Sequence, residues 1–453
     1  MKIVVLGAGY VGLTTSACLA ELGHDLVCCD IDDARVEALN RAQIPIFEPG
    51  LSELVGKQVA AGRLKFSTDA QTHAGRADAV FLAVGTPSDE DGNIDLTYVE
   101  AAVAGIGPSL RPDTLLVVKS TVVAGTARQL KELVDAVRGD SAIAVASNPE
   151  FLREGSAIGD FMEADRIVIG ADDARSEAVL REIYRPLTRR GVPLVAGKTV
   201  NAELIKYAAN ALLALKIGFI NDVANLCEAV GGDVTAVADG IGRDARIGSA
   251  FLAAGPGFGG SCFPKDTRAF ASIGRRHGAP QPLVEALIQG NDQRKADLAQ
   301  RIIAAAPSRG RVAILGTSFK ANTDDVRESA SLAIIPLLQQ AGLEVHAHDP
   351  QPEAAKRQLT DVDWHDDPLA ACRDADVTVI LTEWDEYRSL NLKRMAETMH
   401  GHHLFDFRNI LSAEQAARVG LHYHAIGRPD VLPKAKARGQ GTVAGLAVAA
   451  SPA

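Results

Sequence analysis

The chain has 453 residues, of which 47% are hydrophobic and 23% are charged, and its formal net charge is -10. This length exceeds what one hydrophobic core usually supports, so we expect two or three domains of an ordinary globular protein. The negative charge excludes a general nucleic-acid binder or anionic-membrane binder, because such proteins need a basic face.

Membrane and secretion signals are not found. No apolar run reaches the roughly 20 residues that span a bilayer, and Met1 to Leu6 leads directly into a strand-like pattern instead of a signal peptide. The cysteines lack the spacing of a metal site or of a disulfide framework, which favours reduced thiols in a cytoplasmic protein without a bound metal. They are Cys18, Cys28, Cys29, Cys227, Cys262 and Cys372.

The first stretch, "MKIVVLGAGYVGLTTSACLAELGHDLVCCDID", predicts a strand, a glycine-rich turn, a helix ending at Gly23 and a second strand ending at Asp30. Within "GAGYVG", Gly7, Gly9 and Gly12 have the spacing that gives a tight turn, room for a pyrophosphate and close helix packing. Asp30 lies at a strand end, where a carboxylate can accept hydrogen bonds from both ribose hydroxyls. This combination predicts a dinucleotide site.

The charges around this site favour NAD over NADP. Asp30, Asp32 and Asp33 would repel a phosphate on the ribose. Arg35 is the exception: it either faces the adenine or a phosphate of the cofactor, or is a solvated helix residue.

Three further apolar runs, "ADAVFLAV", "TLLVVK" and "AIAVAS", predict strands of a parallel doubly wound sheet with both faces covered. Each run stops at a polar or glycine-containing motif, which begins at Gly85, Ser120 or Asn148. Because ligands of open parallel sheets bind beyond the carboxyl ends of the strands, we expect these motifs to line one crevice. We assign residues 1–198 to this domain.

A central domain is expected over residues 199–306, and Thr199 to about Val230 predicts one long connecting helix. The helix contains no proline and a single glycine, Gly218. Its continuous apolar content is compatible with an internal core or with burial against a partner subunit.

After Pro307 the opening pattern returns, since "RVAILG", "LEVHAHD" and "ADVTVIL" resemble the earlier strands. We therefore predict a second Rossmann-like domain over residues 307–432. Lys320 and Arg327 follow its first strand, where a phosphate-bearing ligand could bind. Residues 433–453 are rich in small residues and are expected to be disordered.

Three pairs of polar residues have i, i+4 spacing: Glu150 with Glu154, Lys206 with Asn210, and Cys262 with Asp266. If each pair is helical, its members share a face. Their spacing alone does not rank Asp266, Glu150 and Glu154 as acid or base.

Cys262 lies in the glycine-rich stretch "GPGFGGSCFP". It is either a small residue in a crowded backbone or a nucleophile. Gly259 and Gly260 would leave space for a substrate carbon beside the sulfur, and the ammonium of Lys206 would favour the thiolate. A nucleophilic cysteine beside NAD indicates aldehyde oxidation, because thiolate addition gives the adduct that releases hydride, and water then cleaves the thioester.

Eight motifs in order along the chain carry a resemblance to a known family. They are "GAGYVG", "VGTPS", "KSTV", "NPEFLREG", "ELIKYAAN", "RIGSAF", "GFGGSCFPKD" and "FKANTDDVRES". The chain resembles the UDP-glucose 6-dehydrogenases of the UDP-glucose/GDP-mannose dehydrogenase family. The resemblance implies an α/β fold of two Rossmann-like doubly wound parallel-sheet domains joined by a long central helix, and a four-electron oxidation of UDP-glucose to UDP-glucuronate that uses two NAD molecules.

The resemblance also implies roles for individual residues. Catalytic roles fall on Cys262 as nucleophile, Lys206 and Asn210 as oxyanion and substrate contacts, Asp266 and Thr121 in water or proton handling, and Glu150 and Glu154 in substrate contact and thioester hydrolysis. Cofactor contacts fall on Gly7, Gly9, Tyr10, Val11, Gly12, Asp30, Arg35, Thr86, Thr121, Glu154, Lys265 and Arg327. Substrate contacts fall on Glu150, Phe151, Leu152, Arg153, Glu154, Lys206, Asn210, Arg246, Phe251, Leu252, Ala253, Ala254, Gly255, Gly259 and Lys320.

In this family an arginine of the neighbouring subunit reaches the substrate, and "RIGSAF" places that arginine at Arg246. The resemblance therefore implies at least a homodimer with the long helix at its interface. Arg408 is a further match, although Phe407 stands where the family usually has glycine.

Three alternatives remain at this point. The substrate could be another nucleotide sugar such as GDP-mannose, the chain could be an NAD-binding regulatory or scaffold protein, or it could be a two-electron hydroxyacid dehydrogenase that does not need Cys262.

Overall fold

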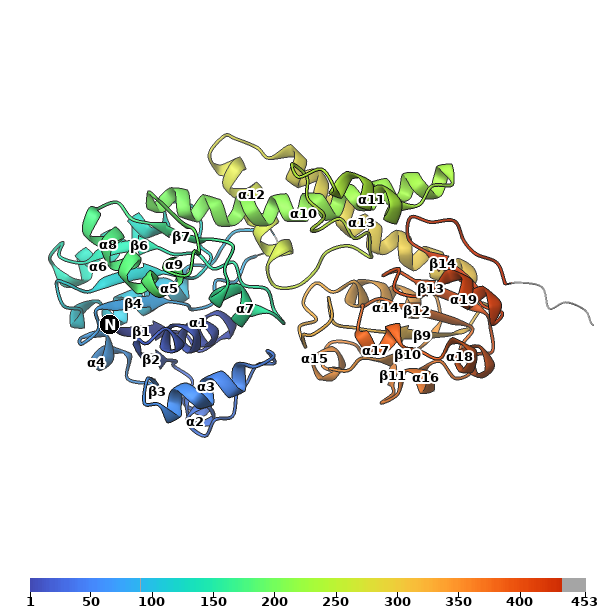
Figure 1. Ribbon diagram of the computed structural model, residues 1–453, viewed down its shortest axis with the longest axis horizontal. Coiled ribbons are helices and arrows are strands. Elements are labelled where there is room, and N and C mark those ends of the chain that lie inside the picture. Colours follow the sequence, from blue (N-terminus) through green and yellow to red (C-terminus); the bar gives the residue numbers. More distant parts are fainter. Residues whose placement is uncertain (90, 434–453) are drawn as a thin grey trace, which may run out of the picture.

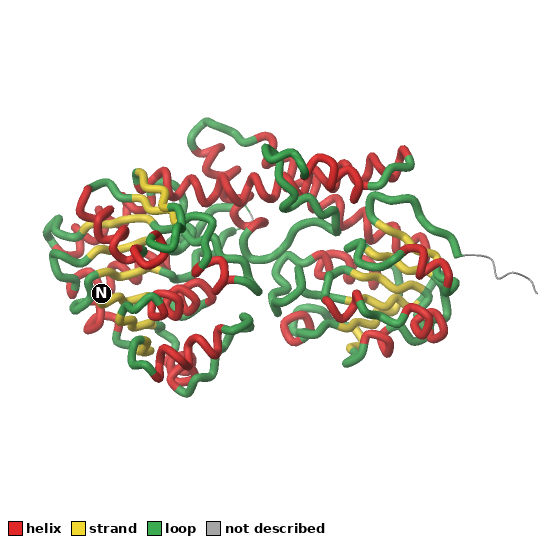
Figure 2. The backbone as a smooth tube through the Cα atoms, in the orientation of Figure 1, coloured by secondary structure: helices red, strands yellow, loops and turns green. Residues whose placement is uncertain are grey.

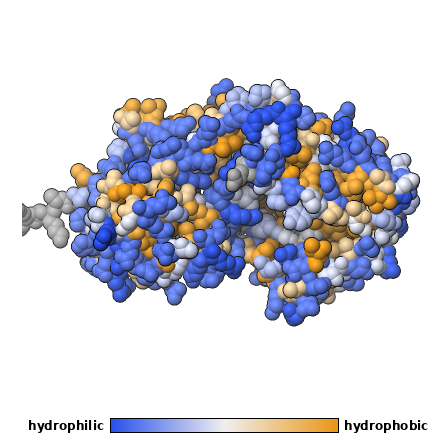
Figure 3. All heavy atoms as spheres, turned by 180° about the vertical axis from the view of Figure 1, so that it is seen from behind, coloured by the Kyte–Doolittle hydropathy of each residue, from blue (hydrophilic) through white to orange (hydrophobic). Residues whose placement is uncertain are grey.

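The computed structural model describes residues 1–89 and 91–433. The tail that the sequence predicts to be disordered therefore lies outside the described residues, except for Pro433. Two α/β domains are joined by helix α10 (Thr199–Val230), which runs along one side of the molecule from the first domain to the second (Figure 1). Seen from behind, a notch separates the two domains, and most of this surface is hydrophilic (Figure 3). The predicted domain boundaries stay a prediction.

The first domain contains an eight-stranded sheet of order β3-β2-β1-β4-β5-β6-β7-β8. Its strands are β1 (Lys2–Leu6), β2 (Asp25–Cys29), β3 (Leu64–Ser67), β4 (Ala79–Leu82), β5 (Leu115–Val118), β6 (Ala144–Ser147), β7 (Ile167–Gly170) and β8 (Leu194–Gly197). Its pairs are parallel except β6 and β7, which are antiparallel at Ser147 and Gly170. The strands that the sequence predicts in this domain, β1, β2, β4, β5 and β6, all pair in parallel, and the one antiparallel pair adds β7, which the sequence analysis did not identify.

Helices cover both faces of this sheet (Figure 2). They are α1 (Tyr10–Glu21), α2 (Asp33–Asn40), α3 (Leu51–Ala60), α4 (Ala70–Ala74), α5 (Thr97–Ile106), the 3-10 turn η1 (Gly107–Ser109), α6 (Thr126–Arg138), α7 (Ala157–Met162), α8 (Ala174–Ile183) and α9 (Arg185–Thr188). Along β1, Ile3 and Val5 belong to one buried cluster, and Val4 and Leu6 to the other. Burial on both faces explains why these strands are continuous apolar runs.

The central segment contains α10, α11 (Val234–Gly242), α12 (Phe263–Arg276) and α13 (Pro282–Ala305). Near the start of α10, Glu203 accepts hydrogen bonds from Gly125 N at 2.6 Å and Ala127 N at 2.9 Å, at the first turn of α6. Near its end, Glu228 accepts one from Gly427 N at 2.7 Å. Each end of α10 is thus fixed to a different domain.

The second domain has a six-stranded sheet of order β11-β10-β9-β12-β13-β14. All of its strand pairs are parallel. Its strands are β9 (Arg311–Leu315), β10 (Glu344–His348), β11 (Val362–Trp364), β12 (Val377–Ile380), β13 (His403–Asp406) and β14 (His422–Ala425), and its helices are α14 (Ala330–Gln340), α15 (Glu353–Lys356), α16 (Pro368–Ala371), α17 (Asp385–Arg388), α18 (Leu392–Thr398) and α19 (Ala413–Arg418). Among the described residues, no helix combines the length and the apolarity that crossing a membrane requires.

Candidate active site

The glycine-rich turn between β1 and α1 is shaped for a dinucleotide. Gly7 has φ +97°, and a Cβ there would lie 2.6 Å from the carbonyl oxygen of Ala83. A Cβ at Gly12 would lie 1.8 Å from the oxygen of Gly7, whereas one at Gly9 would meet no atom of the described residues within 4 Å. Gly7 and Gly12 therefore permit the turn and its packing, and Gly9 leaves open space at the N-terminus of α1, where a pyrophosphate fits.

Asp30 follows β2 and is bound to this turn. Its Oδ2 accepts hydrogen bonds from Ala8 N at 2.7 Å and from Arg35 at 3.2 Å, and its Oδ1 accepts one from Asp32 N at 3.1 Å. A carboxylate has about four acceptor positions, so Asp30 retains capacity for a ribose hydroxyl. Arg35 pairs with Asp30 instead of standing free in solvent.

The predicted crevice residues gather at one edge of the first sheet. Thr86, after β4, donates its hydroxyl to the carbonyl oxygen of Thr121 at 2.9 Å, after β5. Lys119 donates to Asn148 Oδ1 at 3.1 Å, which connects the ends of β5 and β6. The motifs therefore lie side by side, as their positions after neighbouring strands predict.

Lys206 and Glu150 form a buried ion pair at the centre of the site. Lys206 Nζ lies 2.9 Å from Glu150 Oε1, and the two side chains are only 3% and 6% exposed. Burial alone would raise the pKa of Glu150, but the Lys206 charge brings it below its ordinary value. Burial would likewise lower the pKa of Lys206, but the charge of Glu150 raises it. Glu150 is therefore held as a carboxylate, and Lys206 as an ammonium.

Cys262 precedes the first turn of α12, and Asp266 follows within that turn. Asp266 accepts hydrogen bonds from Asn210 Nδ2 at 2.6 Å and from Lys265 Nζ at 2.8 Å. Burial raises the pKa of the Cys262 thiol to about 11, although the charge of Lys206 lowers it. The expected effect of Lys206 is present but smaller than that of burial, so the resting thiol is protonated.

Glu154 has a different environment from the other carboxylates. Its Oε1 accepts a hydrogen bond from Ser261 Oγ at 3.0 Å, and its Oε2 accepts one from Thr323 at 3.2 Å. Ser261 Oγ also lies 3.5 Å from Cys262 Sγ. Burial and the negative charge of Asp325 raise the pKa of Glu154 to about 7. Glu154 therefore has a pKa near neutrality, and only the Ser261 hydroxyl separates it from the thiol. Such a carboxylate suits a general base near neutral pH.

The helical spacing holds for two of the three predicted pairs. Lys206 and Asn210 share α10, and Asp266 N donates to Cys262 O at 2.8 Å. Glu150 and Glu154 instead lie on the loop between β6 and α7, where Glu150 contacts Lys206 and Glu154 faces the second domain. A shared helical face is therefore wrong for this pair.

Gly259 and Gly260 are required for a reason that the sequence does not reveal. A Cβ at Gly259 would lie 2.4 Å from the carbonyl oxygen of Glu328, and one at Gly260 would lie 2.8 Å from the Phe319 ring. The second domain, not an approaching substrate, occupies the space that a side chain would need. These glycines bring the Cys262 loop into direct contact with that domain.

A cleft of about 540 Å³ lies between the domains beside Cys262, within the usual size range of small-molecule sites. Ser261, Lys265, Arg327 and two further cations, Arg268 and Lys295, are among its lining residues. These four cations outnumber Glu328, an acidic lining residue that pairs with Arg268, so the cleft suits phosphate groups.

The remaining predicted substrate residues surround the same region. Phe151 lies under the Lys206 ammonium at 5.4 Å, Leu152 N donates to Glu150, and Arg153 pairs with Asp160.

In the 251–255 segment, Phe251 has φ +64°, Leu252 and Ala254 are buried, and Ala253 is exposed. Gly255 is held by hydrogen bonds with Asn221 and Arg294. Lys320 is partly buried, which lowers its pKa. Arg408 packs against Gly255, since a Cβ built on Gly255 would lie 3.4 Å from Nη1 of Arg408.

Arg246 is placed differently from the other predicted residues. Its side chain is 89% exposed and pairs with Asp244 two residues away. The structure thus leaves its guanidinium on the surface of this chain.

Sequence reasoning missed three residues of the site. Glu48 accepts hydrogen bonds from the Tyr10 hydroxyl, Gly155 N at 2.6 Å and Ala157 N at 2.8 Å, and so ties the start of α1 to the loop that carries Glu154. Ser261 connects that carboxylate with Cys262. Lys119 lies beside Glu150, and its burial lowers its own pKa to about 8. Only Ser261, the neighbour of the cysteine, carried a usable signal in the sequence.

Comparison with known proteins agrees with this geometry. Three models of the UDP-glucose/GDP-mannose dehydrogenase family match: the NAD binding domain over residues 1–188, the central domain over 200–293 and the UDP binding domain over 313–413. The chain belongs to the UDP-glucose/GDP-mannose dehydrogenase family. It is an NAD-dependent oxidoreductase, and the fit of the glycine-rich turn agrees with NAD as its cofactor.

Individual relatives extend over nearly the whole chain. The UDP-glucose 6-dehydrogenase of Rhizobium meliloti (strain 1021) is 49% identical over 95% of this chain and 100% of its own length. UDP-glucose 6-dehydrogenase TuaD of Bacillus subtilis (strain 168) is 45% identical over 95% of this chain and 94% of its own. The UDP-glucose dehydrogenase structure from Pyrobaculum islandicum superposes with a TM-score of 0.85 at 40% identity, covering 90% of this chain and 94% of that one.

Proposed function

We propose that the chain oxidises UDP-glucose to UDP-glucuronate in two successive NAD-dependent steps, with Cys262 as the covalent nucleophile. The observation that carries the proposal is the placement of the Cys262 thiol between two groups of different charge. The Lys206 ammonium lowers the pKa of the thiol, and Ser261 connects the thiol with Glu154, whose pKa is about 7.

The first step converts the primary alcohol of the sugar to an aldehyde. When bound, NAD supplies the hydride acceptor in both oxidations. Lys206 and Asn210 donate hydrogen bonds to the sugar oxygen as negative charge develops there. Asp266 takes up the proton that the alcohol releases, and Thr121 helps to orient the water that carries it. Glu150 keeps the Lys206 side chain in place at 2.9 Å.

The second step is covalent. The sulfur of Cys262 bonds to the aldehyde carbon and the thiol proton ends on the former carbonyl oxygen; loss of the hydride to the nicotinamide acceptor and of this hydroxyl proton to water then leaves a thioester. Glu154 then takes a proton from water, which attacks the thioester carbon and releases the carboxylate and the thiol. One UDP-glucose and one water therefore give one UDP-glucuronate, two NADH and three protons.

Charge and family membership support UDP-glucose as the substrate. Lys320, Arg327 and the cations of the cleft offer partners for the diphosphate, and residues 313–413 match a UDP binding domain. GDP-mannose is the second candidate. A GDP-mannose dehydrogenase structure from the same family is 30% identical over 94% of this chain and 99% of its own length, but it superposes with a TM-score of only 0.53.

We further propose a homodimer or larger homo-oligomer in which α10 lies at the interface. Leu204, Leu212, Phe219, Leu226 and Val230 are exposed on α10 at intervals of eight, seven, seven and four residues, so on a helix they share a face that a second copy can cover. The exposed Arg246 would then reach the substrate of the partner. We expect the enzyme in the cytoplasm, where its unpaired cysteines stay reduced.

Assays with UDP-glucose and GDP-mannose side by side, with NADH formation and sugar products both measured, test this proposal. We expect two NADH per UDP-glucose consumed and little turnover of GDP-mannose. Turnover of GDP-mannose alone would reassign the substrate. One NADH per sugar would indicate a two-electron dehydrogenase, and NAD binding without any turnover would indicate a scaffold.

A further inference from the structure

Three histidines of the second domain meet on one face of its sheet. His403 begins β13, whereas His422 and His424 lie on the neighbouring edge strand β14. His403 pairs in register with His422, and the alternation of side chains puts His424 on the same face as His422. A helix and a loop separate His403 from the other two in the chain, so no ligand spacing in the sequence indicates the group.

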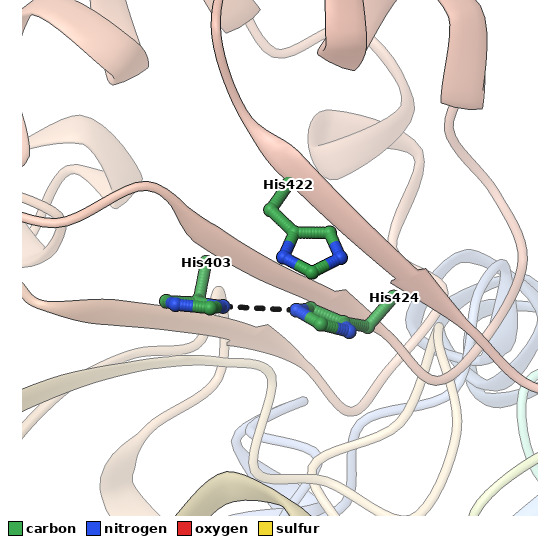
Figure 4. A group of neighbouring side chains, drawn as sticks. All are labelled: His403, His422 and His424. Atoms are coloured by element: carbon green, nitrogen blue, oxygen red, sulfur yellow. Dashed lines mark hydrogen bonds between the residues drawn. The ribbon is translucent and has the colours of Figure 1, made fainter. Parts of the chain in front are cut away.

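Their ring nitrogens converge. One nitrogen from each ring can be chosen such that all three lie within 4.8 Å of one another. His403 Nδ1 is 2.9 Å from His424 Nε2, and the His422 ring lies against the same pair (Figure 4). Two imidazole nitrogens on one tetrahedral zinc ion stand about 3.4 Å apart, given Zn–N bonds of about 2.0 to 2.1 Å. A shift of about half an ångström would therefore bring this pair to ligand spacing.

Asp430 determines which nitrogen of His424 is free. Its Oδ2 lies 2.6 Å from His424 Nδ1, and an ionised carboxylate can only accept, so Nδ1 carries the proton. In the neutral ring, Nε2 then presents its lone pair to the other two histidines. A carboxylate that orients an imidazole from behind in this way is typical of histidines that bind metals.

The other two rings are also suited to be ligands. The His403 and His422 rings both lie against that of His424, with ring centroids 5.2 and 4.0 Å from its own. In addition, His422 Nε2 is buried and finds no hydrogen-bond partner within residues 1–89 and 91–433; it lies 3.8 Å from Asp430 Oδ2, beyond hydrogen-bond reach. A buried nitrogen without a partner is costly, and a cation would satisfy the cluster.

We propose that His403, His422 and His424 bind one divalent transition-metal ion of the zinc class, with Asp430 as the residue that orients His424. Imidazole ligands select such ions over magnesium and calcium, which prefer oxygen. Three protein ligands leave a coordination position for water. The sequence, in which no metal was expected, does not foretell this site.

The position of the site indicates a structural role. His403 and His422 are the first residues of their strands, whereas Lys320 and Arg327 follow the carboxyl end of β9. In a parallel sheet the amino ends and the carboxyl ends of the strands lie on opposite sides, so the histidines are far from Lys320 and Arg327. The ion therefore does not take part in the oxidation. Next to the cluster, Val431 and Tyr423 exchange backbone hydrogen bonds at 2.9 and 3.0 Å. The ion would join β13 and β14 and, through Asp430, the segment that follows β14.

The test is a calorimetric titration of the metal-stripped full chain with Zn²⁺. All proteins carry Cys262→Ser, because a thiolate is itself a zinc ligand. We expect about one tight site per chain, lost in His403→Ala and in His422→Ala, and weakened about 10- to 100-fold in Asp430→Asn. Zn²⁺ should raise the melting temperature of the parent but not that of the ligand variants, because only a bound ion stabilises the fold.

Two control variants keep the test specific. His400→Ala removes an exposed histidine that pairs with Asp376, and His346→Ala disrupts a second histidine pair, formed with His365. Both should bind Zn²⁺ like the parent. The proposal is overturned if the parent does not bind Zn²⁺, if His422→Ala binds it unchanged, or if His346→Ala loses the site. Should an alanine variant fail to fold by circular dichroism, His422→Asn keeps a planar polar group at this position and serves in its place.

Discussion

Hydrolysis of the Cys262 thioester should depend on pH with an inflection near 7, because this is the pKa that burial and the charge of Asp325 give to Glu154. With a pKa of about 7, about 9% of this carboxyl is ionised at pH 6 and about 91% at pH 8. The hydrolysis rate should therefore rise about tenfold over this range. A carboxyl with its ordinary pKa is almost fully ionised at both pH values and would give a flat profile.

The assay follows the covalent enzyme directly. UDP-glucose and excess NAD are mixed with enzyme, the reaction is stopped at intervals, and intact-mass spectrometry measures how fast the acylated enzyme disappears. Because the sulfur is acylated during this step, the pKa of the Cys262 thiol does not enter the profile. Glu154→Gln should slow the step at least about 100-fold, which is the usual contribution of a general base.

A second variant tests the physical cause of the shift. Asp325 raises the pKa of Glu154 by its negative charge and also holds Arg327 at 2.6 Å. Asp325→Asn removes that charge and leaves Arg327, which already lies 3.4 Å from Glu154 Oε1, with Glu154 as its charged partner, so the inflection should move below 7. The reasoning is refuted if the wild-type profile is flat between pH 6 and 8, or if the inflection persists in Glu154→Gln.

Three further changes have defined outcomes. Lys206→Met leaves Glu150 buried and unpaired, so urea denaturation should show a loss of about 3 to 5 kcal/mol, much of it recovered when Glu150→Gln is added. Gly12→Ala should prevent stable folding, as measured by circular dichroism, since its Cβ would lie 1.8 Å from a carbonyl oxygen. Gly9→Ala should fold normally but lose NAD affinity, as measured by calorimetry. Cys262→Ser should bind NAD but form no UDP-glucuronate, as chromatography of the products would show.

Each of these expectations has a contradicting result. Unchanged stability of Lys206→Met would mean that Glu150 finds another partner or a proton. Wild-type NAD affinity in Gly9→Ala would place the pyrophosphate elsewhere. Substantial UDP-glucuronate from Cys262→Ser would leave the cysteine without a covalent role.

The elements that local patterns determine could be predicted well. The helix predicted from Thr199 to about Val230 has these limits in the structure, because proline is absent and a glycine with φ +77° follows at Gly231. The first βαβ unit and its glycine turn are likewise encoded within about 30 contiguous residues. Lys206 and Asn210 could be paired because helical spacing alone sets their relation.

Contacts between distant segments could not be predicted. Glu48, on the loop before α3, meets the backbone at Gly155 and Ala157 only because that loop packs against the start of α7. The carboxylates also could not be ranked, because their protonation follows from neighbours contributed by other elements. Lys206 from α10 neutralises Glu150, whereas Asp325 from the second domain raises the pKa of Glu154. Gly259 was assigned to substrate access, although the backbone of Glu328 requires it.

The most direct measurement is the intact mass of Glu154→Gln after mixing with UDP-glucose and excess NAD. With hydrolysis blocked, a UDP-glucuronyl group should accumulate on the enzyme, and peptide mapping should locate it on the sulfur of Cys262. An enzyme that forms NADH under these conditions while its mass stays unchanged would contradict the covalent route.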